Sequence, residues 1–243
     1  MIKIEHAVLA SPEQMEFIIE GMRNPMNSWD NSDSYENYEA EYDDDLPGVE
    51  IHHPYFRVGA ADRALMQRLA NSGTDHRKFM RMMPVYVRIT APLYWWKEFD
   101  TYKVGTVANS CSTMHKIQEK EFTLDDFSCE HLINSPLIES EPGLPELLNM
   151  QAKNMLEIII GVLNAARYNY LKTKDKKYWW QMIQLLPSSY NQTRNVMMNY
   201  EVLANIYKSR KDHKLDEWRE FCKWIESLPF HELIDETNSS DEG

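Results

Sequence analysis

The chain has 243 residues, of which 43% are hydrophobic and 12% are aromatic, so it has enough apolar side chains for a core and is not a disordered chain. It contains no apolar run that is long enough to span a membrane and no signal peptide, so we expect no membrane partner. Its three cysteines (Cys111, Cys129 and Cys222) show no metal-ligand spacing, which is typical of a cytoplasmic protein.

The net charge of -12 is concentrated in two segments. Residues 30–50 contain nine acids, residues 232–242 contain five, and neither segment contains Lys or Arg. The remaining 24 acids and 26 bases give the rest of the chain a charge of +2, which is compatible with a pocket for a phosphate. No basic helix or aromatic strip indicates DNA or RNA binding. We expect one domain over residues 1–230 with an acidic insertion at about 28–54, followed by a disordered acidic tail at 231–243.

The first half of the chain predicts two strands and three helices. Residues 2–9 alternate weakly and predict an edge strand, and residues 85–90 alternate clearly and predict a second strand. Ser11 followed by Pro12 is typical of a helix start. The helices are expected at about 12–22, at about 60–70 with Leu65, Met66 and Leu69 inward, and from Pro92 onward.

The second half predicts mostly helix. Residues 101–117 are small and polar, which favours a ligand-binding loop. A long helix is expected from Pro145 to about Tyr170, with an inward face, and a further helix at 178–186. The segment 185–218 then predicts one helix of about twenty residues. The inward face comprises Met155, Leu156, Ile159, Val162 and Leu163, and one face of the last helix comprises Asn199, Leu203, Ile206 and Arg210. Together, the predicted helices and strands indicate an α+β fold, mostly helical with a small sheet.

Three stretches of the sequence resemble the flavin-dependent thymidylate synthases. Pro187 is followed after 12, 16, 18 and 23 residues by Asn199, Leu203, Asn205 and Arg210, as in that family. The sequence VYVRITAPLYWW resembles the family's strand and apolar helix, and GMRNPMNSW and GTDHRKF resemble two of its turns. The resemblance implies the family fold, with a small antiparallel sheet, for most of residues 10–225.

The chain departs from the family at its phosphate-binding signature, Arg-His-Arg-x-x-Ser-x-Asn-x-x-Ser-x-Arg. That signature falls on residues 101–113, where only Lys103 keeps a positive charge and Thr106 keeps a hydroxyl. Ile183 and Glu201 also stand where the family has Arg. Arg binds phosphate through two parallel hydrogen bonds, which Lys and Thr cannot reproduce.

The resemblance implies a homotetrameric methyltransferase of nucleotide biosynthesis that acts on dUMP. Its cofactor would be FAD, and its co-substrates would be NADPH and methylenetetrahydrofolate. It places Arg210 at the pyrimidine, where a guanidinium stabilises negative charge on the ring. It implies that Asn199 and Asn205 contact the flavin, and His76, Arg81, Lys103 and Thr106 are expected beside them. The polar loop residues Asn109, Ser110 and Ser112 are expected at the nucleotide phosphate.

Alternatives remain open for the protein and for its residues. The protein is alternatively a non-catalytic nucleotide- or flavin-binding protein of the same fold, or an enzyme that acts on another pyrimidine nucleotide. Arg210 is alternatively a helix cap or a partner of Asp212 or Glu217. Cys111 has no His at a fixed spacing, so we do not interpret it as a nucleophile, and we expect no metal site.

Overall fold

The computed structural model describes residues 1–42, 50–135 and 151–235. The chain forms two compact units. The first unit comprises Met1–Lys3, Ile89–Thr101 and Asn109–Arg194, and the second unit comprises Ile4–Arg88, Tyr102–Ala108 and Asn195–Gly243. No helix within the described ranges is long and apolar enough to cross a membrane. No group of three or more His, Cys, Asp or Glu side chains in those ranges is arranged to hold a metal ion.

A four-stranded sheet has the strand order β1-β4-β6-β5. Its strands are β1 (Lys3–Leu9), β4 (Pro84–Pro92), β6 (Asn191–Asn199) and β5 (Val107–Ser110). The strands predicted at 2–9 and 85–90 are therefore confirmed, and β1 lies at an edge as expected. With the helices, this sheet confirms the predicted α+β class, mostly helical with a small antiparallel sheet.

Strand β6 shows that the prediction of one continuous helix in the segment 185–218 is wrong. Gln192, Val196 and Met198 are buried and alternate with more accessible positions along this strand. β6 is hydrogen-bonded to β4 on one side and to β5 on the other. This pairing with distant strands outweighs the local preference for helix, because strand formation depends strongly on tertiary neighbours. The helix begins only afterwards, as α7 (Tyr200–Arg210).

Strand β5 corrects the prediction of a loop over residues 101–117. All four residues of β5 are exposed. Without a buried face, the strand leaves no alternation of apolar and polar residues in the sequence. The residues on either side of β5 are turns, as the small polar composition indicates.

Helix α1 (Pro12–Arg23) begins where the sequence predicts it. The Ser11 hydroxyl accepts a hydrogen bond from the Gln14 backbone N–H at 3.2 Å, and the Gln14 side chain accepts one from the Ser11 N–H at 2.9 Å. This reciprocal pair satisfies two backbone donors at the helix end. Helix α2 (Ala60–Asn71) also confirms its prediction, with Leu65 and Met66 buried and Leu69 partly buried. The short helix α3 (Lys78–Met82) follows it in the second unit.

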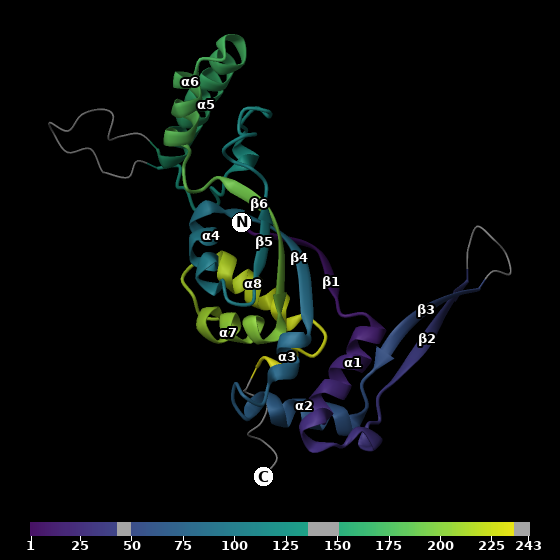
Figure 1. Ribbon diagram of the computed structural model, residues 1–243. Helices are drawn as coiled ribbons and strands as arrows, with labels where there is room; N and C mark the ends of the chain where they lie inside the picture. Colours follow the sequence, from purple (N-terminus) through teal and green to yellow (C-terminus); the bar gives the residue numbers. More distant parts are fainter. Residues whose placement is uncertain (43–49, 136–150, 236–243) are drawn as a thin grey trace. The chain divides into compact units, whose positions relative to one another are not determined.

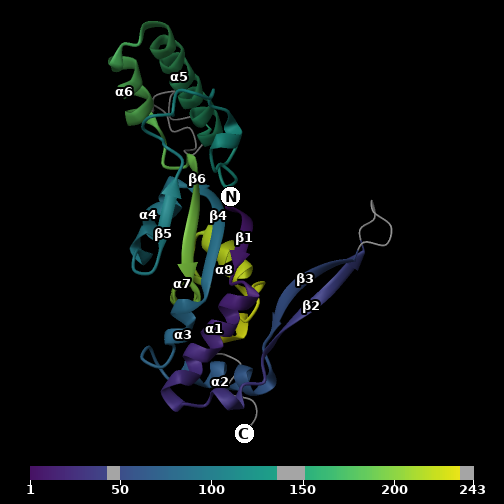
Figure 2. The same cartoon turned by 45° about the vertical axis from the view of Figure 1, so that its right-hand side comes forward.

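The expected acidic insertion contains a β-hairpin. Strands β2 (Tyr35–Tyr42) and β3 (Glu50–Arg57) pair antiparallel, and Figures 1 and 2 both show them side by side. The base of the hairpin is tied to the helices by Asp62, whose buried carboxylate accepts a hydrogen bond from Arg23 Nε at 2.6 Å. The hydroxyls of Ser32 and Ser34 donate to the same carboxylate at 2.7 and 2.6 Å.

The first unit is built on a pair of helices, α5 (Ala152–Thr173) and α6 (Lys176–Leu185), which lie side by side in Figure 1. Leu156 and Leu163 are buried as predicted, but Met155 and Val162 are 37% and 44% exposed, so their inward placement is wrong. They lie on another flank of α5, and a helix covered on one side buries only one stripe. The predicted first turns of this helix, residues 145–150, lie outside the described residues. The core of this unit comprises Ile117, Phe122, Phe127, Leu156, Leu163, Ala166 and Met182, and α4 (Leu93–Phe99) buries Trp95 and Trp96.

The C-terminal part of the second unit comprises α7 and α8 (Asp216–Glu226). Leu203 and Ile206 on α7 and Trp218 on α8 are fully buried. The fold continues past the predicted start of the tail, because a 3-10 turn at His231–Leu233 buries Leu233, and Ile234 is buried after it. The remainder of the predicted tail, residues 236–243, lies outside the described residues.

Candidate functional site

Two aromatic rings hold the guanidinium of Arg210 at the end of α7. The Tyr102 hydroxyl accepts a hydrogen bond from Arg210 Nε at 3.0 Å. The guanidinium carbon lies 4.8 Å from the centre of the Trp218 ring and 5.7 Å from that of the Tyr102 ring. Cation–π contacts at these distances are attractive, and the hydrogen bond limits rotation of the side chain. The arrangement orients a half-buried cation, which is what recognition of a planar, partly anionic ring requires.

Asn199 begins α7 instead of sharing a helical face with Arg210, which corrects the prediction from spacing. Its side-chain oxygen accepts a hydrogen bond from the Val202 backbone N–H at 3.0 Å, and its side chain is buried. The other side of its amide faces Gly105, where a Cβ atom would lie 3.3 Å from Nδ2. Asn199 therefore has a structural role as the helix cap, and its predicted flavin contact stays a prediction.

The turn that carries Lys103 and Thr106 packs against the start of α7. Gly105 has φ +84, and a Cβ there would meet the Val202 side chain at 2.9 Å, so this close approach favours glycine. The Thr106 hydroxyl donates to the Tyr102 carbonyl at 2.7 Å, so it stabilises its own turn. Lys103 is exposed. Both residues belong to the second unit, as Arg210 does.

Asn109, Ser110 and Ser112 belong to the first unit, whereas Arg210 belongs to the second unit. Asn109 and Ser110 are exposed residues of β5 and not of a loop. The Ser112 hydroxyl accepts a hydrogen bond from the His115 backbone N–H at 2.9 Å. Ser112 also borders a polar cavity of about 290 Å³, which is lined by Thr90, Cys111, Ser112, Thr113, Asp125, Asp126, Tyr190, Asn191, Gln192 and Thr193. None of these cavity residues is basic, so the cavity suits a neutral hydroxyl-bearing group better than a phosphate.

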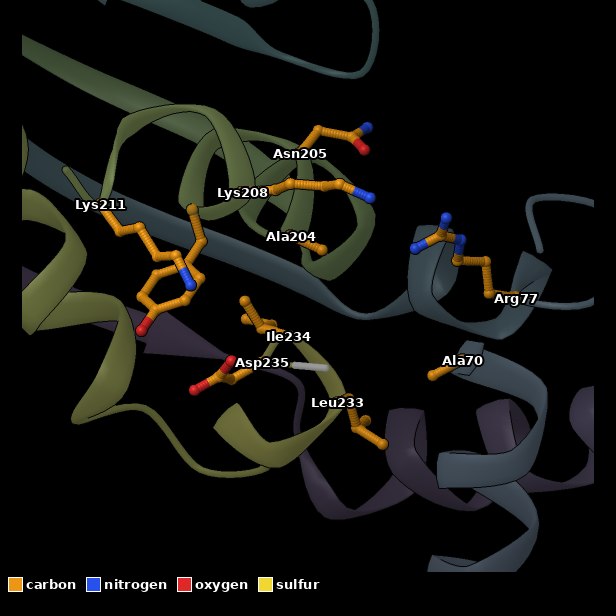
Figure 3. Close-up of a pocket in the computed structure, with 10 residues that line it drawn as sticks. Ala70, Arg77, Ala204, Asn205, Lys208, Lys211, Leu233, Ile234 and Asp235 are labelled. Carbon is orange, nitrogen blue, oxygen red and sulfur yellow. The ribbon is translucent and has the colours of Figure 1, made fainter. Parts of the chain in front are cut away.

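Asn205 lies at a second cavity, between α7 and the helices α2 and α3 of the same unit (Figure 3). This cavity, here called the α3–α7 pocket, has a volume of about 240 Å³. It is lined by Ala70, Arg77, Ala204, Asn205, Tyr207, Lys208, Lys211, Leu233, Ile234 and Asp235. Its three basic side chains outnumber its single acid, which favours an anionic occupant.

Arg81 and His76 lie next to this pocket without lining it. Arg81 binds Glu201 through Nε and, at 3.3 Å, through Nη2, and it donates to the Thr74 carbonyl at 3.0 Å. The hydrogen bond to Glu201 is the main cause that raises the pKa of the Arg81 guanidinium above its ordinary value. His76 is exposed, and its backbone N–H donates to the Gly73 carbonyl. The Arg81 guanidinium is thus engaged by protein groups.

Sequence reasoning missed Arg77 and Lys208. Arg77 follows His76 directly in the GTDHRKF turn. Lys208 follows Asn205 by three residues, which places Asn205 and Lys208 on one side of α7. The second spacing is a usable signal. No local sequence pattern predicts that Arg77 and Lys208 line the same pocket, because their positions in the sequence differ by 131.

Comparison with known proteins places the fold. Neither a protein-family model nor a curated protein matches the sequence. Among solved structures, Thymidylate Synthase X (ThyX) from Helicobacter pylori with FAD and dUMP matches with a TM-score of 0.59 at 15% identity, over 98% of each chain. A second ThyX complex from that organism matches with a TM-score of 0.57 at 16% identity, over 97% of this chain and 98% of the other. The UMP/dUMP methylase PolB from Streptomyces cacaoi matches with a TM-score of 0.56 at 13% identity, over 96% of this chain and 93% of that one. The chain therefore has the fold of the flavin-dependent thymidylate synthases and of the UMP/dUMP methylase PolB.

Proposed function

We propose that this protein is a divergent thymidylate synthase-like enzyme that methylates a pyrimidine nucleotide, with dUMP as the first candidate. The observation that carries the proposal is the orientation of Arg210 by Tyr102 and Trp218, at a position where the resembling family contacts the pyrimidine. The fold supports the proposal, because structures with this fold contain dUMP or a brominated UMP or dUMP.

Arg210 has a clear chemical task in such a reaction. A guanidinium beside N3 and O4 of the pyrimidine stabilises an anionic form of the ring, whose C5 is then nucleophilic enough to attack a one-carbon donor. Tyr102 and Trp218 keep the guanidinium in one orientation, so little reorganisation is needed during the reaction. Arg210 is also half-buried, and its electrostatic effect is stronger there than in bulk water.

The chain also has groups that fit part of FAD. Arg77, Asn205, Lys208 and Lys211 offer hydrogen-bond donors around the α3–α7 pocket, and Arg77 Nε is buried without a hydrogen-bond partner among the described residues. Such a donor set suits the phosphates of a dinucleotide, and about 240 Å³ holds only a part of one. When bound, reduced FAD would supply the hydride, with methylenetetrahydrofolate as the one-carbon donor and NADPH as the reductant.

The experiment is a product assay with the purified full chain. Wild-type protein is incubated with methylenetetrahydrofolate, FAD, NADPH and either dUMP or UMP, and the methylated nucleotide is measured by chromatography. We expect product with at least one nucleotide and none with Arg210→Ala. Arg68→Ala is the matched control, because Arg68 is an exposed residue of α2 and lines neither cavity. Product from UMP alone would assign the other pyrimidine substrate.

A non-catalytic nucleotide- or flavin-binding protein is the second candidate. Thr101 and Tyr102 favour it. They stand at the first two positions of the family's phosphate-binding signature, and their side chains bind protein groups instead. The Thr101 hydroxyl donates to the Glu98 carbonyl at 2.7 Å, and the Tyr102 hydroxyl accepts from Arg210. Binding of dUMP or FAD with no methylated product under any condition of the assay would favour this second function over the first.

A further inference from the structure

We propose that the α3–α7 pocket is a phosphate-binding site in which Arg77 and Lys208 supply the positive charge. These two residues lie outside the segment 101–113 and match none of the positions that the resemblance assigns. The anion site rests on the geometry of the pocket alone, whereas the identity of its ligand as a nucleotide or dinucleotide rests on the proposed function.

Arg77 is the strongest evidence for a bound anion. Its side chain is only 17% exposed, and its Nε atom is buried with no hydrogen-bond partner among the described residues. A buried charged donor without an acceptor is rare in folded proteins and indicates a missing partner. The Arg77 guanidinium borders the α3–α7 pocket, so a ligand in that pocket is the partner that the geometry offers.

Glu201 does not satisfy Arg77. Its Oε1 atom lies 4.0 Å from Arg77 Nε, which is too far for a hydrogen bond. Both of its oxygens instead accept hydrogen bonds from Arg81. One carboxylate therefore faces two guanidinium groups, and its hydrogen bonds go to Arg81 and not to Arg77.

Lys208 and Asn205 approach the same point from α7. Figure 3 shows both side chains extending from the helix toward Arg77, the residue before α3, whose side chain points back toward them. Ala70 and Ala204 also line the pocket, and their small side chains fill little of this space. A guanidinium, an ammonium and an amide thus surround a volume in which a phosphate fits.

Asp235, the acidic residue among those that line the pocket, lies on the side away from Arg77. Figure 3 shows Asp235 beside Lys211, away from the Arg77 guanidinium. The Lys211 ammonium also lies 5.7 Å from the centre of the Tyr207 ring. The end of the pocket near Arg77 is therefore lined by Arg77 and Lys208 and not by Asp235. A phosphate matches it better than a carboxylate, because it carries more charge and has more acceptor oxygens.

The test uses inorganic pyrophosphate as the probe and isothermal titration calorimetry on the full chain. We expect wild-type protein to bind pyrophosphate, and Arg77→Gln and Lys208→Gln to weaken this binding at least tenfold. Lys78→Gln is the matched control, since it removes the same charge from the residue that follows Arg77, which is exposed and does not line the pocket. It should change the affinity less than twofold. Because Lys208 is exposed, Lys208→Gln tests the site even if Arg77→Gln is unstable.

Competition then identifies the source of the phosphate. Displacement of pyrophosphate by dUMP assigns the pocket to the substrate phosphate, and displacement by FAD assigns it to the cofactor. The site is refuted if wild-type protein does not bind pyrophosphate, or if both pocket variants bind it as wild type does. An equal loss in Lys78→Gln refutes it as well. An inactive protein that binds pyrophosphate through Arg77 would refute the proposed function and keep the site. An active enzyme whose pyrophosphate affinity changes in neither Arg77→Gln nor Lys208→Gln would refute the site and keep the proposed function.

Discussion

The hydroxyl of Tyr102 offers a narrow test of how Arg210 is held. Tyr102→Phe removes the acceptor that lies 3.0 Å from Arg210 Nε and keeps the aromatic ring whose centre is 5.7 Å from the guanidinium carbon. A hydrogen bond to a charged group contributes roughly 1.5–3 kcal/mol. Arg210 is only half-buried, and the Trp218 ring remains in contact with it. We therefore expect the lower end of this range, about 1.5 kcal/mol.

Two measurements check this value. For a chain of this size a loss of that order lowers the melting temperature by roughly 3–6 °C. If the hydrogen bond also orients Arg210 toward the nucleotide, the affinity for dUMP falls by about tenfold. Thermal unfolding and dUMP titration are compared between Tyr102→Phe and the control Tyr168→Phe, which alters a tyrosine that is 64% exposed. An unchanged dUMP affinity in Tyr102→Phe, together with a large loss in Arg210→Ala, would show that Tyr102 does not position the guanidinium.

Three further predictions concern stability. Asp62→Ala leaves the Arg23 guanidinium buried without its carboxylate, so urea denaturation should show a loss of about 3–5 kcal/mol, and a loss under 1 kcal/mol would contradict this. Gly105→Ala combines φ +84 with a Cβ 2.9 Å from the Val202 side chain, so the same assay should show a loss of at least about 1–2 kcal/mol. Burial raises the pKa of the Cys222 thiol from 9.0 to about 12. The unfolded thiol therefore ionises first, so this contribution to stability is complete below pH 9 and is lost as the pH rises toward 12. Urea midpoints at pH 8 and pH 10 should thus differ more in wild-type protein than in Cys222→Ala.

The elements that the sequence predicted correctly depend on near neighbours. Ser11 and Gln14 are three residues apart and cap α1 through their own backbone. The alternation along residues 85–90 arises because every second side chain of β4 is buried. The spacing from Asn199 to Arg210 also locates the segment that contains α7, although it does not give the start of that helix.

The tertiary structure decided the features that depend on distant residues. β6 is a strand because β4 and β5 lie on either side of it, and no local pattern in the segment 185–218 records that pairing. The α3–α7 pocket arises because α3 and α7 bring Arg77 and Lys208 to one cavity. The sequence by itself determined the fold class and the candidate role of Arg210. Only the folded chain showed which aromatic rings hold that guanidinium and where positive charge collects, because contact between side chains is a property of the packed structure.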